Sequence, residues 1–211
     1  MKNKKNIKKD SNIFIKIISY INKNIFGISK SIIFELDLVK PGPKITSDLD
    51  LTFKLATKED IKKMDKENYG YDKKGKIYSI YRLEKGDRCV LALYNDKIIA
   101  YIWIMKDTLE LSKNNYIFLS KKRAGSYKGF CVKKYRGKRV HGTIYCNYLI
   151  NLLRREGKRY VVSAVYTDNK SSLKAMQRLG NKIIGHMIHF NFFGLKYDYI
   201  KKKNLSYLQN S

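Results

Sequence analysis

The stretch Phe130-Cys-Val-Lys-Lys-Tyr-Arg-Gly-Lys-Arg-Val-His-Gly-Thr143, with the residues that follow it up to Tyr166, decides the fold of this chain. The apolar run at residues 128–132 predicts a buried strand, and residues 143–155 repeat apolar side chains at helical spacing. Gly157 can end that helix in a left-handed conformation, and residues 160–166 read as a second buried strand. A strand, a short turn, a helix and a strand predict a right-handed βαβ unit with parallel strands.

The turn of this unit, residues 133–142, combines two glycines with a high density of Lys and Arg. It places backbone N–H groups at the N-terminus of the predicted helix, rimmed by Arg136, Lys138 and Arg139. Such an arrangement favours anions, so the turn predicts a seat for a phosphate-bearing ligand.

These residues resemble a known signature. Residues 132–143 look like the acyl-coenzyme A motif of the GNAT N-acyltransferases, V-x-x-x-[Y/x]-[Q/R]-x-x-G-x-[G/A]. The positions that fit are Arg136, Gly137, Lys138 and Val140. The second and third motif glycines fall on Arg139 and His141, and Gly142 comes one residue late.

A second block strengthens the resemblance. The segment Asn169-Lys-Ser-Ser-Leu-Lys-Ala-Met-Gln-Arg-Leu-Gly180 is similar to the family's N-x-x-[A/S]…[Y]-x-x-x-G-F segment. The resemblance covers roughly residues 50–190. It implies a mixed α/β (α+β) fold with a central, mostly antiparallel sheet, one parallel βαβ crossover and helices on both faces.

The resemblance also implies a function. A GNAT-like enzyme transfers an acetyl group from acetyl-CoA to a primary amine by direct attack, and proximity supplies much of the rate. We expect the acceptor to be a small molecule, an amino sugar or an amino acid. No metal is expected.

Site residues follow from the same resemblance. The strand Phe130, Cys131 and Val132 would offer backbone groups to the pantetheine, including an N–H for the oxyanion. The pyrophosphate would be held by Arg136, Gly137, Lys138, Arg139, Val140, His141, Gly142 and Thr143. Asn169 and Ser172 would lie near the pantetheine or the sulfur.

The acid–base groups are not selected by the sequence. Relatives carry a tyrosine where this chain has Met176, which cannot donate a proton, and Asn181 replaces the phenylalanine after the helix glycine. Tyr127, Tyr166, His141 or a water stay open as substitutes. Because Arg139, His141 and Met176 depart from the motif, one alternative is a degenerate GNAT fold that binds a ligand without efficient turnover.

The net charge of +27 suggests a second alternative, a basic module that binds nucleic acid or a membrane. The basic residues are 36 Lys and only 9 Arg, spread over the whole chain. Phosphate and base recognition favours Arg, so this composition argues against nucleic acid as the main partner.

The cysteines, Cys89, Cys131 and Cys146, have no metal-ligand spacing, and neither do the three histidines. The odd number of cysteines, two of them inside predicted strands, indicates free thiols in a reducing, cytoplasmic compartment.

The N-terminal part is predicted to stand apart from the catalytic domain. Apolar residues over Asn12 to Phe34 recur at helical spacing, with Lys16, Lys23 and Lys30 on the other side. Those lysines argue against a transmembrane span or a signal peptide. We expect a helix that docks on the domain, or on a second copy in a homodimer, or lies on the inner face of a membrane.

The domain boundaries follow. Residues 1–48 are predicted as a basic arm and linker, 49–201 as the acyltransferase domain and 202–211 as a polar tail. Further predicted elements are a strand at 51–56, a capping box at Thr57–Asp60, a helical stretch at 69–84, a hairpin at 86–105, a loop at 107–115, a short strand at 116–120, and strands at 182–190 and 192–200.

Overall fold

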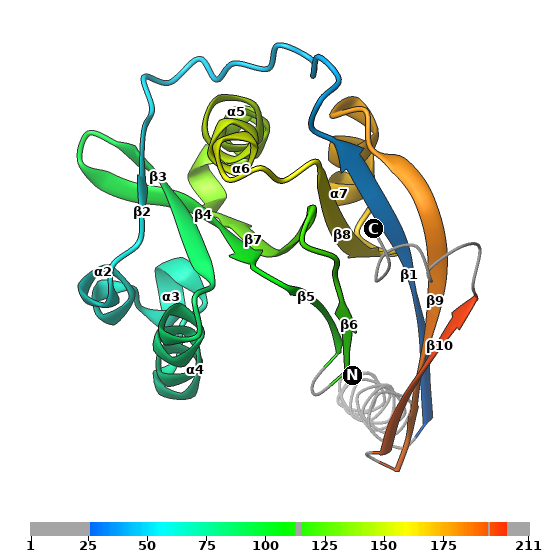
Figure 1. Cartoon of the computed structure of the whole chain (residues 1–211). Helices are drawn as coiled ribbons and strands as arrows, with labels where there is room; N and C mark the ends of the chain where they lie inside the picture. Colours follow the sequence, from blue (N-terminus) through cyan, green and yellow to red (C-terminus); the bar gives the residue numbers. More distant parts are fainter. Residues whose placement is uncertain (1–25, 113–114, 194, 202–211) are drawn as a thin grey trace, which may run out of the picture.

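A computed structural model describes residues 26–112, 115–193 and 195–201. They form an eight-stranded mixed sheet in the order β10-β9-β1-β8-β7-β4-β3-β2, with a separate β5-β6 hairpin (Figure 1). The strands are β1 (Phe26–Asp37), β2 (Thr52–Leu55), β3 (Arg88–Tyr94), β4 (Lys97–Met105), β5 (Thr108–Ser112), β6 (Asn115–Phe118), β7 (Arg123–Cys131), β8 (Tyr160–Tyr166), β9 (Lys182–Phe192) and β10 (Leu195–Lys201). The helices are α2 (Lys58–Lys63), α3 (Lys66–Tyr69), α4 (Lys73–Glu84), η1 (Lys133–Tyr135), α5 (Val140–Thr143), the π-helical η2 (Ile144–Leu149), α6 (Ile150–Arg155) and α7 (Lys170–Arg178).

The predicted βαβ unit is present. β7 and β8 are the one parallel pair among the described strands, and the helical segment from α5 to α6 connects them. Every other described pairing is antiparallel. The mixed α+β class, the mostly antiparallel sheet and the single parallel crossover are therefore confirmed.

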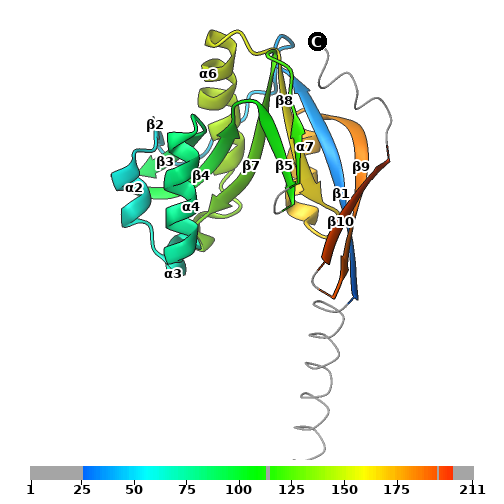
Figure 2. The ribbon, with the colours of Figure 1, turned by 60° about the horizontal axis from the view of Figure 1, so that its bottom comes forward.

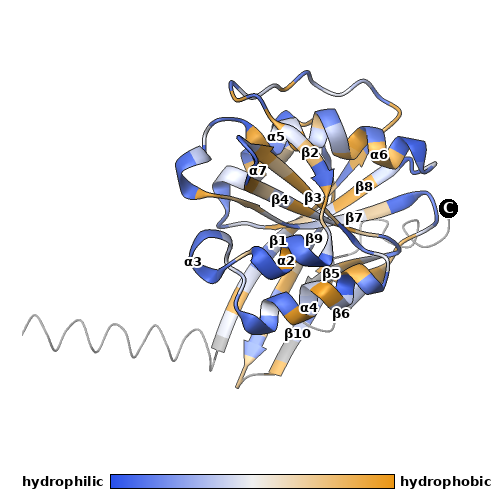
Figure 3. Ribbon diagram, turned by 90° about the vertical axis from the view of Figure 1, so that its left-hand side faces the viewer, coloured by the Kyte–Doolittle hydropathy of each residue, from blue (hydrophilic) through white to orange (hydrophobic). Residues whose placement is uncertain are grey.

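Helices cover both faces of the sheet, as predicted. In Figure 3, α5 and α6 lie on one side of the strands, and α2, α3, α4 and the β5-β6 hairpin lie on the other. On the first side Ile144, Leu149 and Leu153 pack on β3 and β4. On the second side Ile61 and Met64 pack against Trp103, whose indole N–H donates to the Tyr71 hydroxyl at 2.8 Å.

Local signals elsewhere are confirmed too. Thr57 and Asp60 form the capping box of α2, and the β3-β4 hairpin turns through Asn95 and Asp96 at φ 48° and 59°. These left-handed angles match the twist of a two-residue hairpin turn.

The prediction of a helix reaching Phe34 is wrong for the part that the structure describes. Residues 26–37 form β1, which pairs with β8 on one side and β9 on the other. The isoleucine-rich run is β-branched, which favours strands, and both neighbours supply backbone partners. Ile33 packs on one face of the sheet and Leu36 on the other. The strand is therefore apolar on both faces, whereas the predicted helix would have been apolar along one stripe. Residues 12–25 of the predicted helix lie outside the described residues.

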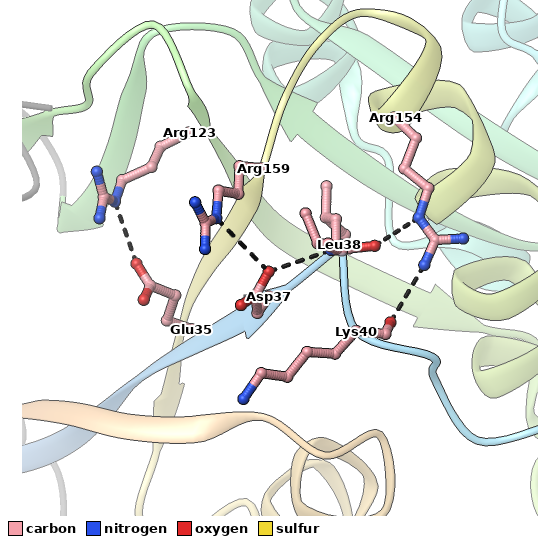
Figure 4. Close-up of polar contacts among 8 residues, drawn as sticks. Glu35, Asp37, Leu38, Lys40, Arg123, Arg154 and Arg159 are labelled. Atoms are coloured by element: carbon pink, nitrogen blue, oxygen red, sulfur yellow. Dashed lines mark hydrogen bonds and ion pairs between the residues drawn. The ribbon is translucent and has the colours of Figure 1, made fainter.

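Three arginines fasten the end of β1 to the βαβ unit (Figure 4). Arg123 Nε lies 3.1 Å from Glu35 Oε2, and Arg159 Nε lies 3.9 Å from Asp37 Oδ1. Arg154 on α6 donates to the carbonyl oxygens of Leu38 and Lys40. The strand thus belongs to the same sheet as the parallel pair, as Figure 2 also shows.

The loop predicted at 107–115 is another correction, because most of it forms β5 and the start of β6. Leu109 is fully buried in a cluster with Ile33 and Val162, so tertiary packing makes this polar segment a strand. β5 crosses β7 where the chain has Gly125: a Cβ there would lie 2.4 Å from the Thr108 carbonyl oxygen.

Candidate functional site

The site lies where the two parallel strands separate. The β7-β8 register runs from Arg123↔Tyr160 to Ser126↔Ser163, and beyond that point β7 stays with β4 while β8 stays with β1. A cavity of about 1000 Å³ opens between them. It is lined by β7, β8, α7, the turn before α5, Tyr78 of α4 and Ser31 of β1.

A bulge in β7 shapes one wall of this cavity. Tyr101 pairs with Phe130 but Trp103 pairs with Tyr127, so β7 carries one extra residue at this point. Lys128 takes φ 48°, and Lys128 and Gly129 both line the cavity. Bulges turn backbone groups out of the regular ladder, so this wall can offer them to an amide-bearing ligand.

The predicted phosphate turn contains two residues with left-handed backbone. Gly137 and Arg139 adopt φ 84° and 58°, both left-handed, and the helix begins at Val140. Arg139 therefore occupies, as a non-glycine residue, the conformation that favours glycine. No side chain caps this N-terminus, so the first-turn N–H groups can receive an anion.

Some of the predicted site residues line the cavity and others do not. Those that line the cavity are Arg139, His141, Gly142, Asn169 and Ser172. Those that do not line it are Phe130, Cys131, Val132, Arg136, Gly137, Lys138, Val140 and Thr143. Arg136 Nε donates to the Cys131 carbonyl oxygen at 3.0 Å, and the Val132 N–H donates to Ile99 at 2.9 Å. The Val132 N–H is thus already used within the sheet, so it is not the N–H of this strand that would meet the oxyanion.

Gly142 allows a close contact that was not predicted from the sequence. We call residues 38–51, which run over α5, η2 and α6, the strap. A Cβ on Gly142 would lie 2.6 Å from Ile45 Cγ2 of the strap, and Ser47 Oγ donates to the Lys138 carbonyl oxygen at 2.7 Å. Lys44 and Ile45 also line the cavity. Gly142, which comes one residue later than the motif glycine, therefore leaves room for Ile45 of the strap.

His141 lies against the bulge. A Cβ on Gly129 would be 3.4 Å from its Cε1, and its Nε2 is buried without a hydrogen-bond partner among the described residues. Burial lowers the pKa of His141, Arg136 acts in the same direction, and the backbone of Phe130 and Tyr101 opposes them. The neutral imidazole is favoured, so His141 can accept a hydrogen bond or a proton from a ligand.

Tyr145 lies at the point where β7 and β8 separate, which we call the apex of the cavity. Its hydroxyl is 2.7 Å from Ser126 Oγ and 3.5 Å from Ser163 Oγ, and all three residues line the cavity. Burial raises the pKa of Tyr145, while the two serines oppose this. The phenol therefore stays protonated and can donate. Sequence reasoning missed it because Tyr145 sits in a π-helical turn, a feature that apolar spacing does not reveal.

Residues of α7 form the opposite wall. Asn169 caps this helix by accepting from the Ser172 N–H at 3.2 Å, and Met176 lines the cavity one helical turn further. Tyr127 and Tyr166, the two tyrosines considered from the sequence, also line it. The three residues considered from the sequence for acid–base work, Tyr127, Tyr166 and His141, thus meet Met176 at one cavity.

Two negative findings concern the described residues alone. They contain no group of three or more His, Cys, Asp or Glu side chains that could hold a metal ion. No helix in this part of the chain combines the length and apolar character needed to span a membrane.

Comparisons with known proteins agree with this geometry. The model of the acetyltransferase (GNAT) family matches residues 55–180, more than half of the chain. The search of curated proteins finds no match.

Solved structures share the fold. A GNAT-family acetyltransferase from Colwellia psychrerythraea superposes with a TM-score of 0.57 at 14% identity, covering 84% of this chain and 61% of that one. A GCN5-related N-acetyltransferase from Sphaerobacter thermophilus gives 0.54 at 10% identity, covering 90% and 58%. A tandem GNAT protein from the clavulanic acid biosynthesis pathway gives 0.56 at 14%, covering 81% and 54%. This chain therefore spans less than two thirds of the length of each of these structures.

Proposed function

The chain belongs to the GNAT acetyltransferase family, and from this premise we propose that it is an N-acetyltransferase. It transfers the acetyl group of acetyl-CoA to a primary amine of a small molecule, an amino sugar or an amino acid by direct attack. The observation that carries the proposal is the cavity where β7 and β8 part, with a bulge on one wall and an uncapped helix N-terminus at its edge.

The pyrophosphate and the pantetheine of the co-substrate are each matched to one part of the site. The pyrophosphate fits the N–H groups that follow Arg139, because an anion is stabilised at a helix N-terminus. The pantetheine amides fit the bulge at Lys128 and Gly129, and the thioester then points toward Tyr145. Free thiols at Cys89, Cys131 and Cys146 support a cytoplasmic location, where thiols stay reduced.

We predict that Gly137→Val weakens acetyl-CoA binding at least about tenfold, or about 1.4 kcal/mol. Gly137 has φ 84°, which a β-branched residue avoids, so the turn must rearrange. Titration calorimetry with acetyl-CoA measures the effect. Gly157→Val is the matched control, because Gly157 has φ 72° in open space and lies away from the cavity. Equal affinities in the two variants would contradict the placement of the pyrophosphate.

Tyr145 is the proposed donor of the proton that the coenzyme thiolate takes up. Tyr145→Phe keeps the ring and removes the hydroxyl, so we expect kcat to fall about 100-fold with little change in acetyl-CoA affinity. Met176→Leu should keep most of the activity, because the thioether donates no proton. Release of the coenzyme thiol measures both. The assignment fails if Tyr145→Phe stays fully active or if Met176→Leu loses activity while still folded.

A second candidate function is binding without efficient turnover. It is favoured by His141, whose ring fills the space beside Gly129 that the pantetheine would pass. Calorimetry combined with thiol release separates the two. Tight binding of acetyl-CoA with no amine-dependent release would favour the second candidate.

A further inference from the structure

Three neighbouring strands bring together a serine, a histidine and an aspartate that are far apart in the sequence. Ser31 Oγ of β1 lies 2.8 Å from His189 Nε2 of β9, and His189 Nδ1 lies 2.6 Å from Asp198 Oδ1 of β10. His189 and Asp198 are direct cross-strand partners, and β1, β9 and β10 run side by side in Figure 2. Ser31 is 2% exposed and His189 8%.

The two hydrogen bonds orient the imidazole. A carboxylate only accepts hydrogen bonds, so Asp198 holds a proton on Nδ1, and the tautomer that this selects presents Nε2 as an acceptor to the Ser31 hydroxyl. Tyr166 of β8 also faces this group, with its ring 5.0 Å from that of His189. Partial burial raises the pKa of Tyr166, and the charges of Asp198 and Asp168 add to this.

The chain of hydrogen bonds ends at the wall of the functional cavity. Ser31 lines the cavity and pairs with Tyr166, beyond the point where β8 has left β7. His189 and Asp198 do not line it and lie behind Ser31. Burying three polar groups is costly, and a serine backed by histidine and aspartate is the arrangement that makes a hydroxyl exchange its proton readily.

Ser31 and the phosphate turn lie on opposite faces of the sheet. Ser31 and Ile33 are two residues apart on β1 and so share one face of the strand, and Ile33 packs in the cluster of Leu109 and Val162 on the face away from α5. The phosphate turn precedes α5 on the other face. Ser31 therefore lies on the side of the cavity away from the phosphate turn, which the proposed coenzyme position leaves to the acceptor.

We propose that Ser31, His189 and Asp198 form the proton relay that deprotonates the acceptor amine during acetyl transfer. This inference rests on the proposed function. As the amine nitrogen bonds to the thioester carbon, its surplus proton passes to Ser31 Oγ, and Ser31 passes its own proton to His189 Nε2. Asp198 stabilises the resulting imidazolium.

A second proton is needed by the sulfur that leaves the acetyl group. The C–S bond breaks, the sulfur leaves with the electron pair, and Tyr145 supplies its proton. His189 Nε2 returns its proton through Ser31 Oγ to solvent at the cavity, and Tyr145 takes up a proton from the same solvent. The products are the amide and the coenzyme thiol, and the enzyme regains its starting state.

The pH profile of the full chain tests the relay. Acetyl-CoA is assayed with a panel of primary amines, namely spermidine, glucosamine and lysine, and the fastest acceptor is used. We expect His189→Gln and Ser31→Ala to lower kcat/KM for the amine about 100-fold near neutral pH, with unchanged acetyl-CoA affinity. The loss should shrink as pH rises, because the amine then deprotonates in solution. A purely structural role would not give this rescue.

Matched variants complete the test. His186→Gln changes an exposed histidine of the same strand and should behave as wild type. Ser31→Thr keeps the hydroxyl and should retain activity, and Asp198→Asn should reproduce His189→Gln if that variant does not fold. If folded His189→Gln or Asp198→Asn keeps the turnover and the pH profile of the wild type, the relay is overturned. Mass spectrometry that finds acetyl on Ser31 would also overturn it, in favour of a covalent route. A wild-type chain that does not bind acetyl-CoA would overturn the proposed function itself.

Discussion

Deletion of residues 1–40 is expected to abolish folding, although the deleted part lies before the region matched by the family model. β1 would be lost from between β8 and β9, which exposes two strand edges and cuts the sheet in two. Ile33, Phe34 and Leu36 are 0%, 1% and 6% exposed. Burying three such side chains contributes on the order of 4.5–9 kcal/mol, comparable with the whole stability of about 5–15 kcal/mol.

Deletion of residues 1–25 is the matched control, because it leaves every described strand in place. Circular dichroism and thermal melting of the two truncated chains give the comparison. We expect a cooperative melt for 26–211 and none for 41–211. A cooperative melt of 41–211 near that of the full chain would contradict the central role of β1. Membrane contact is one of the three alternatives for the predicted helix that carries Lys16, Lys23 and Lys30; under that alternative the chain 26–211 should also stop sedimenting with anionic vesicles.

What could be predicted from the sequence was local. The strand at 160–166 has the predicted bounds, since a short apolar run bounded by polar residues needs no distant partner to be recognised. The hairpin turn at Asn95 and Asp96 and the capping box at Thr57 are likewise decided by adjacent residues. The βαβ unit followed from these local patterns and from the fixed handedness of the crossover.

What could not be predicted depends on pairing between distant strands. Residues 26–34 fit a helical stripe as well as a strand, and only the open edges of β8 and β9 decide between them. The approach of Ser31 to His189 spans 158 residues and depends on the register of β1 against β9. The spacing of residues along the sequence does not reveal the register between two distant strands.

The site was predicted in outline and missed in its details. Arg139, at a motif position where the family signature has glycine, adopts a left-handed backbone that glycine would favour. Gly142, by contrast, makes room for Ile45 of the strap, a contact invisible without the tertiary structure. Tyr145 reaches the apex because the helix widens into a π turn there.

Breaking the Arg123–Glu35 pair is expected to cost far more than breaking the exposed Lys58–Glu84 pair. Arg123 is 3% exposed and Glu35 14% at their side chains. Arg123 also donates through Nη1 to Ser120 Oγ at 3.1 Å, and its guanidinium lies 4.6 Å over the Tyr160 ring. The pair joins β1 to β7 across β8 (Figure 4).

Arg123→Ala should therefore lower the free energy of unfolding by about 3–5 kcal/mol, because it leaves the Glu35 carboxylate buried without its counter-charge. The double variant Arg123→Met with Glu35→Gln should recover part of this loss, since it removes both charges and keeps the volume. Lys58→Ala is the matched control: its pair with Glu84 is 48% and 51% exposed, so we expect a loss below about 1 kcal/mol. Urea unfolding of the four proteins measures the differences. If Arg123→Ala costs no more than Lys58→Ala, the pair does not hold β1 in the sheet, and apolar packing alone must do so.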